Sequence, residues 1–372
     1  MAQIFPAGQR VVVTEYAETP QEALEKYVHL VEQPAPDPAA LKPHEVIMAV
    51  KSVAVAWVDL LMTSGQYQHM APLPYTPGME YAGEVLAVGS GVDPAQCAVG
   101  DRVLADPWKI GPRSSGDYQG SGGFASYAVL PVDGVMKIPA ELTYDDATGL
   151  LQAYETAYHC LVARGQVQSG ETVLINGATG LTGLAAVQVA KLLGATVIAT
   201  GRSDNKLATV KQQGADHVVN ILDADGEVRE FRNDVKALTG GEGVDVVYDA
   251  VGGNVSNESL RCMAFGGRFL IVGWTSTPNV ARGKGLRGAP NVNTLPTNII
   301  QMKSLSVLGC PAVISVNKNP AIRIPRLEAI FRWIKEGKIQ PFVSHTYPLA
   351  EFKQAMLARW NGDVTGGCVL HP

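Results

Sequence analysis

The segment TVLINGATGLTGLAAVQVAKLLGATVIATG, residues 172–201, decides the fold. A short apolar run leads into a turn with Gly177, Gly180 and Gly183, and a helical run and a second apolar run follow. Short apolar strands that alternate with helices indicate a parallel sheet covered on both faces. The segment therefore predicts the first strand, helix and second strand of a doubly wound α/β domain.

The glycine turn has the composition of a phosphate-binding loop. Only glycine lets the backbone turn this sharply, lets a pyrophosphate approach the main chain, and lets the helix pack closely on its strand. The first N–H groups of the helix and the positive end of its dipole then face the anion. A glycine triplet is often merely a turn, but this one follows a strand and opens an amphipathic helix, which favours nucleotide binding. The predicted cradle comprises Gly177, Ala178, Thr179, Gly180, Leu181, Thr182 and Gly183.

The residues after the second strand favour NADPH over NADH. A carboxylate at this point accepts a hydrogen bond from a ribose 2′-hydroxyl but repels a 2′-phosphate. Here the strand ends at Gly201, and Arg202, Ser203 and Lys206 follow. Two cations and a hydroxyl suit a phosphate dianion through charge-assisted hydrogen bonds. The alternative is that Arg202 and Lys206 are solvated charges at the start of a helix.

The remaining sequence indicates two domains, one of them discontinuous. Strand-like HVVN (217–220), VDVVYDA (244–250), RFLIVG (268–273) and LSVLG (305–309) continue the alternation of strands and helices. Residues 46–136 instead form short β-rich runs between glycine and proline turns, which is typical of an irregular antiparallel sheet. We assign residues 1–145 and 316–372 to an outer, catalytic domain, and residues 146–315 to an inserted nucleotide-binding domain.

Composition excludes several classes of protein. The 372 residues are 46% hydrophobic and 17% charged, with a formal net charge of −5 and no long basic run, which argues against nucleic-acid binding. The five cysteines form no CxxC pair, so reduced thiols are expected. The N-terminal MAQIFPAGQR lacks a signal pattern, and polar residues interrupt every apolar stretch. We expect a cytoplasmic protein that binds a small-molecule substrate and no membrane.

Further motifs extend over most of the chain, from about residue 45 to residue 372. They are PYTPGMEYAGEVLAVGSGV (74–92), VGDRV (99–103), GGFASYAVLP (122–131), TAYHCL (156–161), INGATGLTGLAAVQVAKLLGA (175–195), YDAVGG (248–253), GGRFLIVG (266–273) and LPTNIIQMKSLSVLG (295–309). With these motifs the sequence resembles the medium-chain dehydrogenase/reductase superfamily, in its zinc-free quinone oxidoreductase and enoyl reductase branch. The resemblance implies a Rossmann doubly wound parallel sheet inserted in a GroES-like, mainly antiparallel β outer domain, with nicotinamide and substrate meeting in a cleft between them.

The resemblance also implies that the protein holds no metal. Zinc-dependent members use a cysteine, a histidine and a third ligand, and the matching positions here hold Ala56, Met79 and Gln152. Alanine and methionine offer no suitable donor, and a single amide cannot hold zinc. The structural zinc lobe of those enzymes needs four closely spaced cysteines, whereas Cys97 is alone in its region.

Without zinc, an activated C=C bond (an enone, enal or acyl thioester) or a quinone is the expected acceptor, because a conjugated carbonyl takes up charge as its enolate. By resemblance Thr156 lies near the nicotinamide, and Tyr67 and Asp59 lie on the opposing wall. Tyr67 is the preferred proton or hydrogen-bond donor; the alternatives are that it is only a partly buried aromatic and that water donates the proton. The backbone expected to line the nicotinamide and its ribose belongs to Val251, Gly252, Val272 and Gly273.

The resemblance places Trp57, Trp108 and Trp274 around the substrate cavity, as hydrophobic walls. The basic segment ARGKGLRG, residues 281–288, brings Arg282 and two further cations to a loop after the last of these tryptophans. Such a loop would recognise a carboxylate, a phosphate or a coenzyme A moiety, and the alternative is a solvated surface loop.

Two other functions stay open at this point. The first is NADPH-dependent reduction of a ketone or aldehyde, and the second is an NADPH-liganded binding protein with little turnover. The sequence also predicts a homodimer, because KSLSVLG (303–309) is expected to form an edge strand that pairs with its twofold mate. The alternative is that PAVISVNKNP (311–320) covers this edge as a loop within one subunit.

Overall fold

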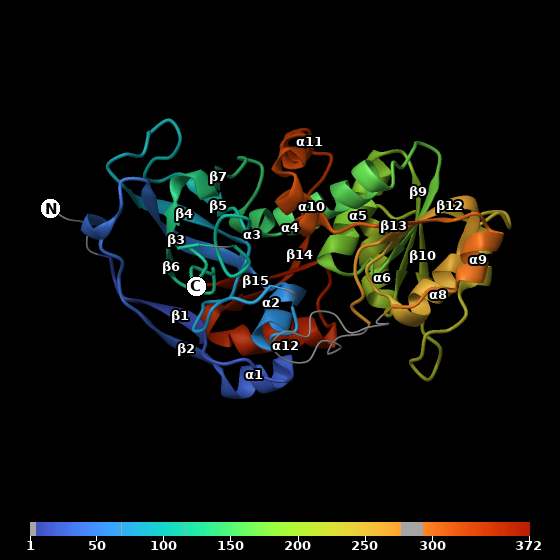
Figure 1. The fold of residues 1–372 in the computed structure, drawn as a ribbon, viewed down its shortest axis with the longest axis horizontal. Helices are drawn as coiled ribbons and strands as arrows, with labels where there is room; N and C mark the ends of the chain where they lie inside the picture. The colour runs from blue at the N-terminus through green and yellow to red at the C-terminus, as the bar shows by residue number, and fades with distance from the viewer. Residues whose placement is uncertain (1–4, 68, 115, 277–292) are drawn as a thin grey trace. The chain divides into compact units, whose positions relative to one another are not determined.

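The computed structural model describes residues 5–67, 69–114, 116–276 and 293–372 (Figure 1). These residues divide into two compact units. Unit 1 holds the described residues up to Gly149 together with Val343–Pro372, and unit 2 holds the described residues from Leu150 to Phe342. The chain therefore leaves unit 1, completes unit 2 and then returns, as expected for an inserted domain.

Unit 2 contains a parallel sheet with the strand order β10-β9-β8-β11-β12-β13. Val173, Leu174 and Ile175 of β8 are fully buried, as strands covered on both faces require. The order reverses between β8 and β11, so their carboxyl ends form a topological switch point, where ligands of such sheets bind. The predicted Rossmann fold is confirmed. Its strands are β8 (Thr172–Asn176), β9 (Thr196–Gly201), β10 (His217–Asn220), β11 (Val244–Asp249), β12 (Met263–Ile271) and β13 (Ser306–Gly309).

Helices alternate with these strands and cover them. Phe231, Leu260 and Phe269 belong to one buried apolar cluster that joins helices to the sheet. Figure 1 shows α8 and α9 side by side next to this sheet. The helices of unit 2 are α4 (Leu151–Ala157), which continues as a π-helical segment (Tyr158–Arg164), α5 (Leu181–Leu192), α6 (Asp204–Gln212), α7 (Arg232–Leu238), α8 (Gly253–Cys262), α9 (Thr297–Met302), α10 (Ala312–Lys318) and α11 (Arg323–Lys335), with a 3₁₀ turn at Pro320–Ile322.

Unit 1 is built on a mainly antiparallel sheet, as predicted for a GroES-like domain. Its order is β14-β15-β3-β4-β5-β7, and β6 also pairs with β3. Only the β14–β15 pair is parallel among the described strands of this sheet. The strands are β3 (Glu45–Ala54), β4 (Tyr81–Val88), β5 (Arg102–Ala105), β6 (Tyr127–Pro131), β7 (Val135–Lys137), β14 (Val343–Pro348) and β15 (Gly367–His371), and β1 (Gly8–Val13) and β2 (Val28–Gln33) form a separate antiparallel ribbon.

Three helices of unit 1, α1, α2 and α12, lie together (Figure 1). Leu24, Leu60 and Phe352, one from each helix, belong to the buried apolar core of this unit. No helix of the described residues is both long and apolar enough to cross a bilayer. The helices are α1 (Pro20–Lys26), α2 (Trp57–Thr63), α3 (Tyr144–Thr148) and α12 (Phe352–Asn361), with 3₁₀ turns at Pro38–Ala40, Val132–Gly134 and Leu349–Glu351.

The second boundary between the units differs from the expected one. We assigned the chain from residue 316 onward to the outer domain, but α11 belongs to unit 2, which extends to Phe342. Glu155 of α4 accepts hydrogen bonds from Arg323 of α11 at 2.9 and 3.0 Å, and it pairs with Arg326 at 3.4 Å. These contacts hold α11 against α4, so the chain returns to unit 1 only after α11.

Candidate functional site

The turn between β8 and α5 needs glycine at two positions for different reasons. Gly177 has φ +68°, in the left-handed region that favours glycine. A Cβ on Gly183 would lie 2.3 Å from the Gly177 carbonyl oxygen, so α5 packs directly on the turn. The Gly180 N–H donates to the same carbonyl at 3.1 Å, and the Ala178 N–H donates to Thr200 of β9 at 3.2 Å.

The helix α5 directs its first amides toward this turn. Gly180 is the N-cap, and the Leu184 N–H donates to the Gly180 carbonyl at 2.9 Å. The N–H groups of Leu181, Thr182 and Gly183 therefore have no acceptor within the helix, and they lie at the positive end of its dipole. Free amides beside a turn without side-chain bulk fit the pyrophosphate of a dinucleotide.

A buried polar network lies beneath the turn, at the carboxyl ends of β8, β9 and β11. Asn176 donates to Asp249 Oδ1 at 3.1 Å and to Ser259 Oγ at 2.8 Å. Thr200 Oγ1 donates to Asn176 Oδ1 at 2.9 Å. All four side chains are at most 1% exposed, and buried polar groups of this kind must be paired. The network therefore fixes three strands and α8 in one arrangement.

Asp249 connects this network to the loop after β11. Its Oδ1 accepts hydrogen bonds from the N–H groups of Val251 at 3.1 Å and Gly252 at 3.4 Å, and its Oδ2 accepts one from the Ser256 hydroxyl. Burial raises the pKa of Asp249, and these donors offset part of that effect. The network was not predicted from the sequence, although the polar residues Asn176, Thr200 and Asp249 at the ends of apolar strands indicate it.

The loop after β11 adjoins the glycine turn. A Cβ on Gly177 would lie 3.1 Å from Cγ2 of Val251. Gly252 has φ +84°, and a Cβ there would lie 2.9 Å from Cβ of Trp274, whose residue is 49% exposed. Four predicted residues from separate parts of the chain thus lie at one edge of the sheet.

The end of β12 completes this edge. The N–H groups of Val272 and Gly273 donate to the Asp249 carbonyl at 2.8 and 3.2 Å. The structure therefore brings the predicted backbone of both loops to the switch point of the sheet. The predicted Arg282, with its basic segment, lies outside the described residues.

The corner between β9 and α6 holds the predicted cofactor-selecting residues. Gly201 ends β9, and a Cβ there would lie 3.0 Å from Cγ2 of Thr179 in the glycine turn. Arg202 is exposed, Ser203 is the N-cap of α6, and Lys206 is half-buried. The corner and the turn are therefore neighbours within unit 2.

The acid closest in sequence to this corner is Asp204, the first residue of α6. Its Oδ1 accepts a hydrogen bond from Asn220 Nδ2 at 3.0 Å. Arg229 Nε donates to the Asn220 carbonyl at 2.9 Å, which fixes that partner at the end of β10. The Asp204 carboxylate is thus engaged with β10, and β9 itself ends without an acidic side chain.

Asp59, predicted as a catalytic residue, is 1% exposed within unit 1. Its Oδ2 accepts a hydrogen bond from the Ala56 N–H at 2.9 Å, and its Oδ1 accepts one from the Gly78 N–H at 3.1 Å. Burial raises its pKa to about 6 against the opposing effect of these two amides. These contacts form a helix cap that ties α2 to the loop before β4, and the catalytic role of Asp59 stays a prediction.

The other predicted residues of unit 1 are half-buried aromatic side chains. Tyr67 packs against the apolar core of this unit. Trp57 stacks on Trp360 with ring centroids 4.9 Å apart and an interplanar angle of 6°. The guanidinium carbon of Arg113 lies over the Trp108 ring, 4.8 Å from the centroid of that ring.

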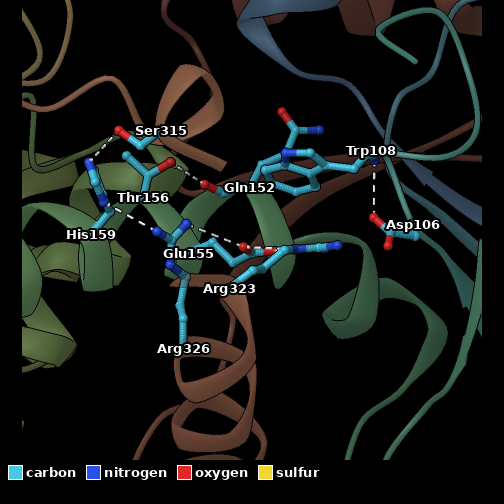
Figure 2. Close-up of polar contacts among 9 residues, drawn as sticks. All are labelled: Asp106, Trp108, Gln152, Glu155, Thr156, His159, Ser315, Arg323 and Arg326. Atoms are coloured by element: carbon cyan, nitrogen blue, oxygen red, sulfur yellow. Dashed lines mark hydrogen bonds and ion pairs between the residues drawn. The ribbon is translucent and has the colours of Figure 1, made fainter. Parts of the chain in front are cut away.

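Thr156 lies on α4 beside a buried ionic cluster (Figure 2). Its Oγ1 donates to the Gln152 carbonyl at 2.6 Å. Its neighbour Glu155 is 1% exposed, and it binds the guanidinium groups of Arg323 and Arg326. The cluster fixes the helix that carries Thr156.

His159 extends this cluster into the π-helical segment. Arg326 donates from Nη2 to His159 Nδ1 at 3.2 Å, and Ser315 Oγ lies 3.4 Å from Nε2 (Figure 2). Because a guanidinium only donates, Nδ1 must accept and the imidazole is neutral. Burial, with the nearby charges of Arg326 and Arg164, lowers the pKa of His159 to about 4. No sequence motif indicated this cluster, since its members are far apart along the chain.

The positions that resemble zinc ligands do not form a metal site. Met79 is 1% exposed in the apolar core of unit 1, and Ala56 is the N-cap of α2. Gln152 lies in unit 2, where its carbonyl accepts the Thr156 hydroxyl. Within the described ranges, no three His, Cys, Asp or Glu side chains gather closely enough to hold an ion. The described residues therefore do not fit zinc.

Comparisons with known proteins agree with this architecture. Residues 42–140 match the alcohol dehydrogenase GroES-like domain, and residues 182–319 match the zinc-binding dehydrogenase family. Quinone oxidoreductase-like protein 2 of Bos taurus is 32% identical over 342 residues, which cover 92% of this chain and 88% of the relative. The chain belongs to the medium-chain dehydrogenase/reductase superfamily, in its quinone oxidoreductase branch.

Solved structures of other proteins resemble this dehydrogenase/reductase over nearly its whole length. A mycobacterial protein solved with NADPH has a TM-score of 0.76 and 27% identity, with 98% of this chain and 100% of that chain covered. A protein described as an NAD-dependent alcohol dehydrogenase has a TM-score of 0.78 and 28% identity, with 98% and 99% covered. The chain is therefore an oxidoreductase of this superfamily, and the superfamily fold accommodates either nicotinamide cofactor.

Proposed function

We propose that this oxidoreductase uses NADPH to reduce an activated C=C bond or a quinone without a metal ion. The observation that carries the proposal is the corner after β9, where the exposed Arg202 follows Gly201 and no acid ends the strand. A guanidinium there favours a 2′-phosphate, whereas a carboxylate would favour the 2′-hydroxyl of NADH. Support also comes from the mycobacterial neighbour solved with NADPH and from relatives named quinone oxidoreductase.

When bound, NADPH supplies the hydride. Gly177 and Gly183 would leave space for its pyrophosphate, and the first amides of α5 would donate to the phosphate oxygens. Arg202, with Ser203 and Lys206, would bind the 2′-phosphate through charge-assisted hydrogen bonds. The network around Asn176 and Asp249 fixes the strand ends beneath the glycine turn before the cofactor binds, so little ordering of these strand ends is needed on binding.

The acceptor needs one hydrogen bond at its carbonyl oxygen and one proton, because conjugation carries the negative charge to that oxygen. We propose Tyr67 as the donor, and Thr156 as a contact of the nicotinamide. The proposed lining of the nicotinamide is the backbone of Val251, Gly252, Val272 and Gly273, and the proposed apolar walls are Trp57, Trp108 and Trp274.

An acceptor screen tests this function. Consumption of NADPH is followed by its absorbance with enones, enals, acyl thioesters, quinones and saturated ketones. We expect turnover of conjugated acceptors or quinones and none of saturated ketones. Turnover of saturated ketones alone would make the protein a carbonyl reductase, and tight NADPH binding without any turnover would make it a binding protein.

Metal independence has a separate test, because Ala56 and Met79 offer no ligand to zinc. We expect the activity found in the screen to survive prolonged treatment with a strong chelator. Elemental analysis of the purified protein should find less than stoichiometric zinc. Stoichiometric zinc whose removal abolishes activity would contradict this part of the proposal.

A further inference from the structure

A cavity of about 170 Å³ lies wholly within unit 1 and is open to solvent. Its walls come from the β1–β2 ribbon, from β6 and from the segments that precede β4 and β6. A cavity of about 150 Å³ holds a molecule the size of benzene, so this one has room for a ligand of roughly six heavy atoms. Among the described residues that line it, Arg10 alone is charged.

The walls of this cavity are joined by hydrogen bonds. The Gln33 side chain connects the ribbon to β6, because its Nε2 donates to the Tyr127 carbonyl at 2.9 Å and its Oε1 accepts from the Tyr127 N–H at 3.0 Å. The Tyr81 hydroxyl donates to the Ser121 carbonyl at 2.7 Å, which holds the segment before β6. The cavity is therefore formed before any ligand arrives, and little ordering is needed on binding.

Arg10 brings an uncompensated charge to this cavity. The residue is exposed, and no group of the described chain forms an ion pair or hydrogen bond with its guanidinium. Glu32, the acidic residue of β2, lies on the opposite face of the ribbon, because Glu32 pairs with Gln9 whereas Arg10 pairs with Val31. The lining thus carries one positive charge and no negative one.

Two hydroxyl groups add hydrogen-bonding capacity to the lining. Thr76 is 4% exposed and Ser121 is half-buried, and neither hydroxyl makes a hydrogen bond within the part of the chain that the structure describes. Neither oxygen is among the unpaired atoms that are sealed from solvent. Because a hydroxyl both donates and accepts, the pair can bind a carboxylate oxygen or a hydroxyl of a ligand.

We propose that this cavity binds a small carboxylate, with its charged group on Arg10 and its remaining polar atoms on Thr76 and Ser121. A planar guanidinium matches the two oxygens of a carboxylate, through charge-assisted hydrogen bonds. A single lining cation balances a single negative charge, whereas a phosphate group carries about 1.5 to 2. The inference goes beyond the proposed reduction and does not depend on it.

Saturation-transfer NMR on the full-length protein, without cofactor, tests the inference. The probes are lactate and lactamide, which have the same number of heavy atoms, carry the same observable methyl group and differ in charge. The wild type should bind lactate about three- to tenfold more tightly than lactamide, because the ion pair forms at an exposed arginine. Arg10→Gln should abolish this preference. Thr76→Val, which keeps the shape of the side chain and removes the hydroxyl, should weaken the binding of both probes.

Lys51→Gln is the matched control for the loss of charge. Lys51 is an exposed cation on β3 of the same unit, and it does not line the cavity. This variant should keep the full preference for lactate. Circular dichroism confirms that each variant is folded.

Four outcomes would overturn the inference. They are no measurable binding of lactate, equal binding of the two probes by the wild type, a preference that survives in Arg10→Gln, and an equal loss of preference in Lys51→Gln, which would indicate only the general field of the surface. Inorganic phosphate that binds more tightly than lactate, measured by displacement of lactate, would contradict the choice of a singly charged ligand.

Discussion

At the corner after β9, one exposed side chain is expected to decide between the two nicotinamide cofactors. Arg202→Ala removes the guanidinium that would bind the 2′-phosphate, a contact worth roughly 1.5–3 kcal/mol. We expect the affinity for NADPH to fall about tenfold or more, and the affinity for NADH to change little. Titration of nicotinamide fluorescence measures both dissociation constants.

Arg232→Ala is a suitable control for this experiment. Arg232 lies on α7 in the same unit and pairs with Glu230 at 3.2 Å. It should leave both affinities unchanged. An equal loss of NADPH and NADH in Arg202→Ala would remove Arg202 from the cofactor site.

His159 makes stability depend on pH in a direction that its surroundings determine. Its folded pKa is about 4, below the unfolded value of 6.5, so between these values the unfolded chain binds more protons. The stabilisation from neutral His159 is complete above pH 6.5 and is lost as the pH falls toward 4, by on the order of 3 kcal/mol. Urea unfolding across this range should therefore show a shallower pH dependence for His159→Gln than for the wild type.

The exposed His29 provides the comparison for that measurement. His29→Gln should keep the pH dependence of the wild type, because His29 is exposed and does not belong to the buried cluster. If His159→Gln and the wild type lose the same free energy of unfolding between neutral and acidic pH, the buried cluster is not the source of the pH dependence of stability.

For single residues, the sequence predicts the features whose residues are contiguous along the chain. The glycines at 177 and 183 follow from a strand, a turn and a helix that are contiguous, and the structure gives each a steric reason. The partners of Asn176, by contrast, come from β9, β11 and α8, so no short motif contains them. The catalytic role of Asp59 stays a prediction from resemblance, and resemblance did not indicate that two backbone amides donate to its oxygens.

Among the elements, α4 and α11 are joined by charges buried in unit 2. Glu155→Met removes the carboxylate and leaves Arg323 and Arg326 without their buried partner. Breaking one side of a buried ion pair costs about 3–5 kcal/mol, so we expect a loss of that order in the free energy of unfolding. Chemical denaturation followed by circular dichroism measures the change.

An exposed ion pair at the end of α11 provides the control for this loss in the free energy of unfolding. Glu336 pairs with Lys338 at 2.8 Å, with side chains 41% and 51% exposed, so Glu336→Met should lower the free energy of unfolding much less than Glu155→Met does. Equal effects of the two substitutions would mean that burial adds nothing to the Glu155 cluster.

The same ionic cluster explains why sequence analysis set the second domain boundary too early. The strand and helix alternation ends after β13, and that pattern was the only signal used for the boundary. The helix α11 nevertheless stays with unit 2, because its arginines neutralise Glu155, which lies far back in the chain. Sequence periodicity predicts that a helix forms, but it does not predict which distant charge the side chains of that helix neutralise.

For the molecule as a whole, the predicted edge strand is present and the homodimer remains a prediction. β13 pairs only with β12 among the described strands, and Val307 is 36% exposed. The Cys310 N–H donates to Ile271 of β12 at 3.0 Å, so the alternation of the strand turns the Val307 N–H away from β12. The next segment, which we weighed as a cover for this edge, contains the helix α10, Ala312–Lys318.

Val307→Pro tests whether this edge joins two copies of the chain. Proline removes the outward N–H, so we expect a dimer in the wild type and a monomer in the variant. Light scattering at micromolar concentration gives the mass of each, and Val307→Thr, which keeps the N–H, should remain a dimer. A monomeric wild type would contradict the predicted assembly, and a dimeric Val307→Pro would place the contact elsewhere.

The return of the chain to unit 1 means that the sheet of this unit is completed late in synthesis. β6 covers residues 45–49 of β3, and the other end of that edge is covered by β15, where Val369 pairs with Ala54 and Leu370 with Val53. A ribosome makes β15 only after the residues of unit 2. Until then, β3 offers an unpaired end to neighbouring nascent chains. A premature stop codon before β15 would make that exposure permanent, although the nucleotide-binding unit would already be complete.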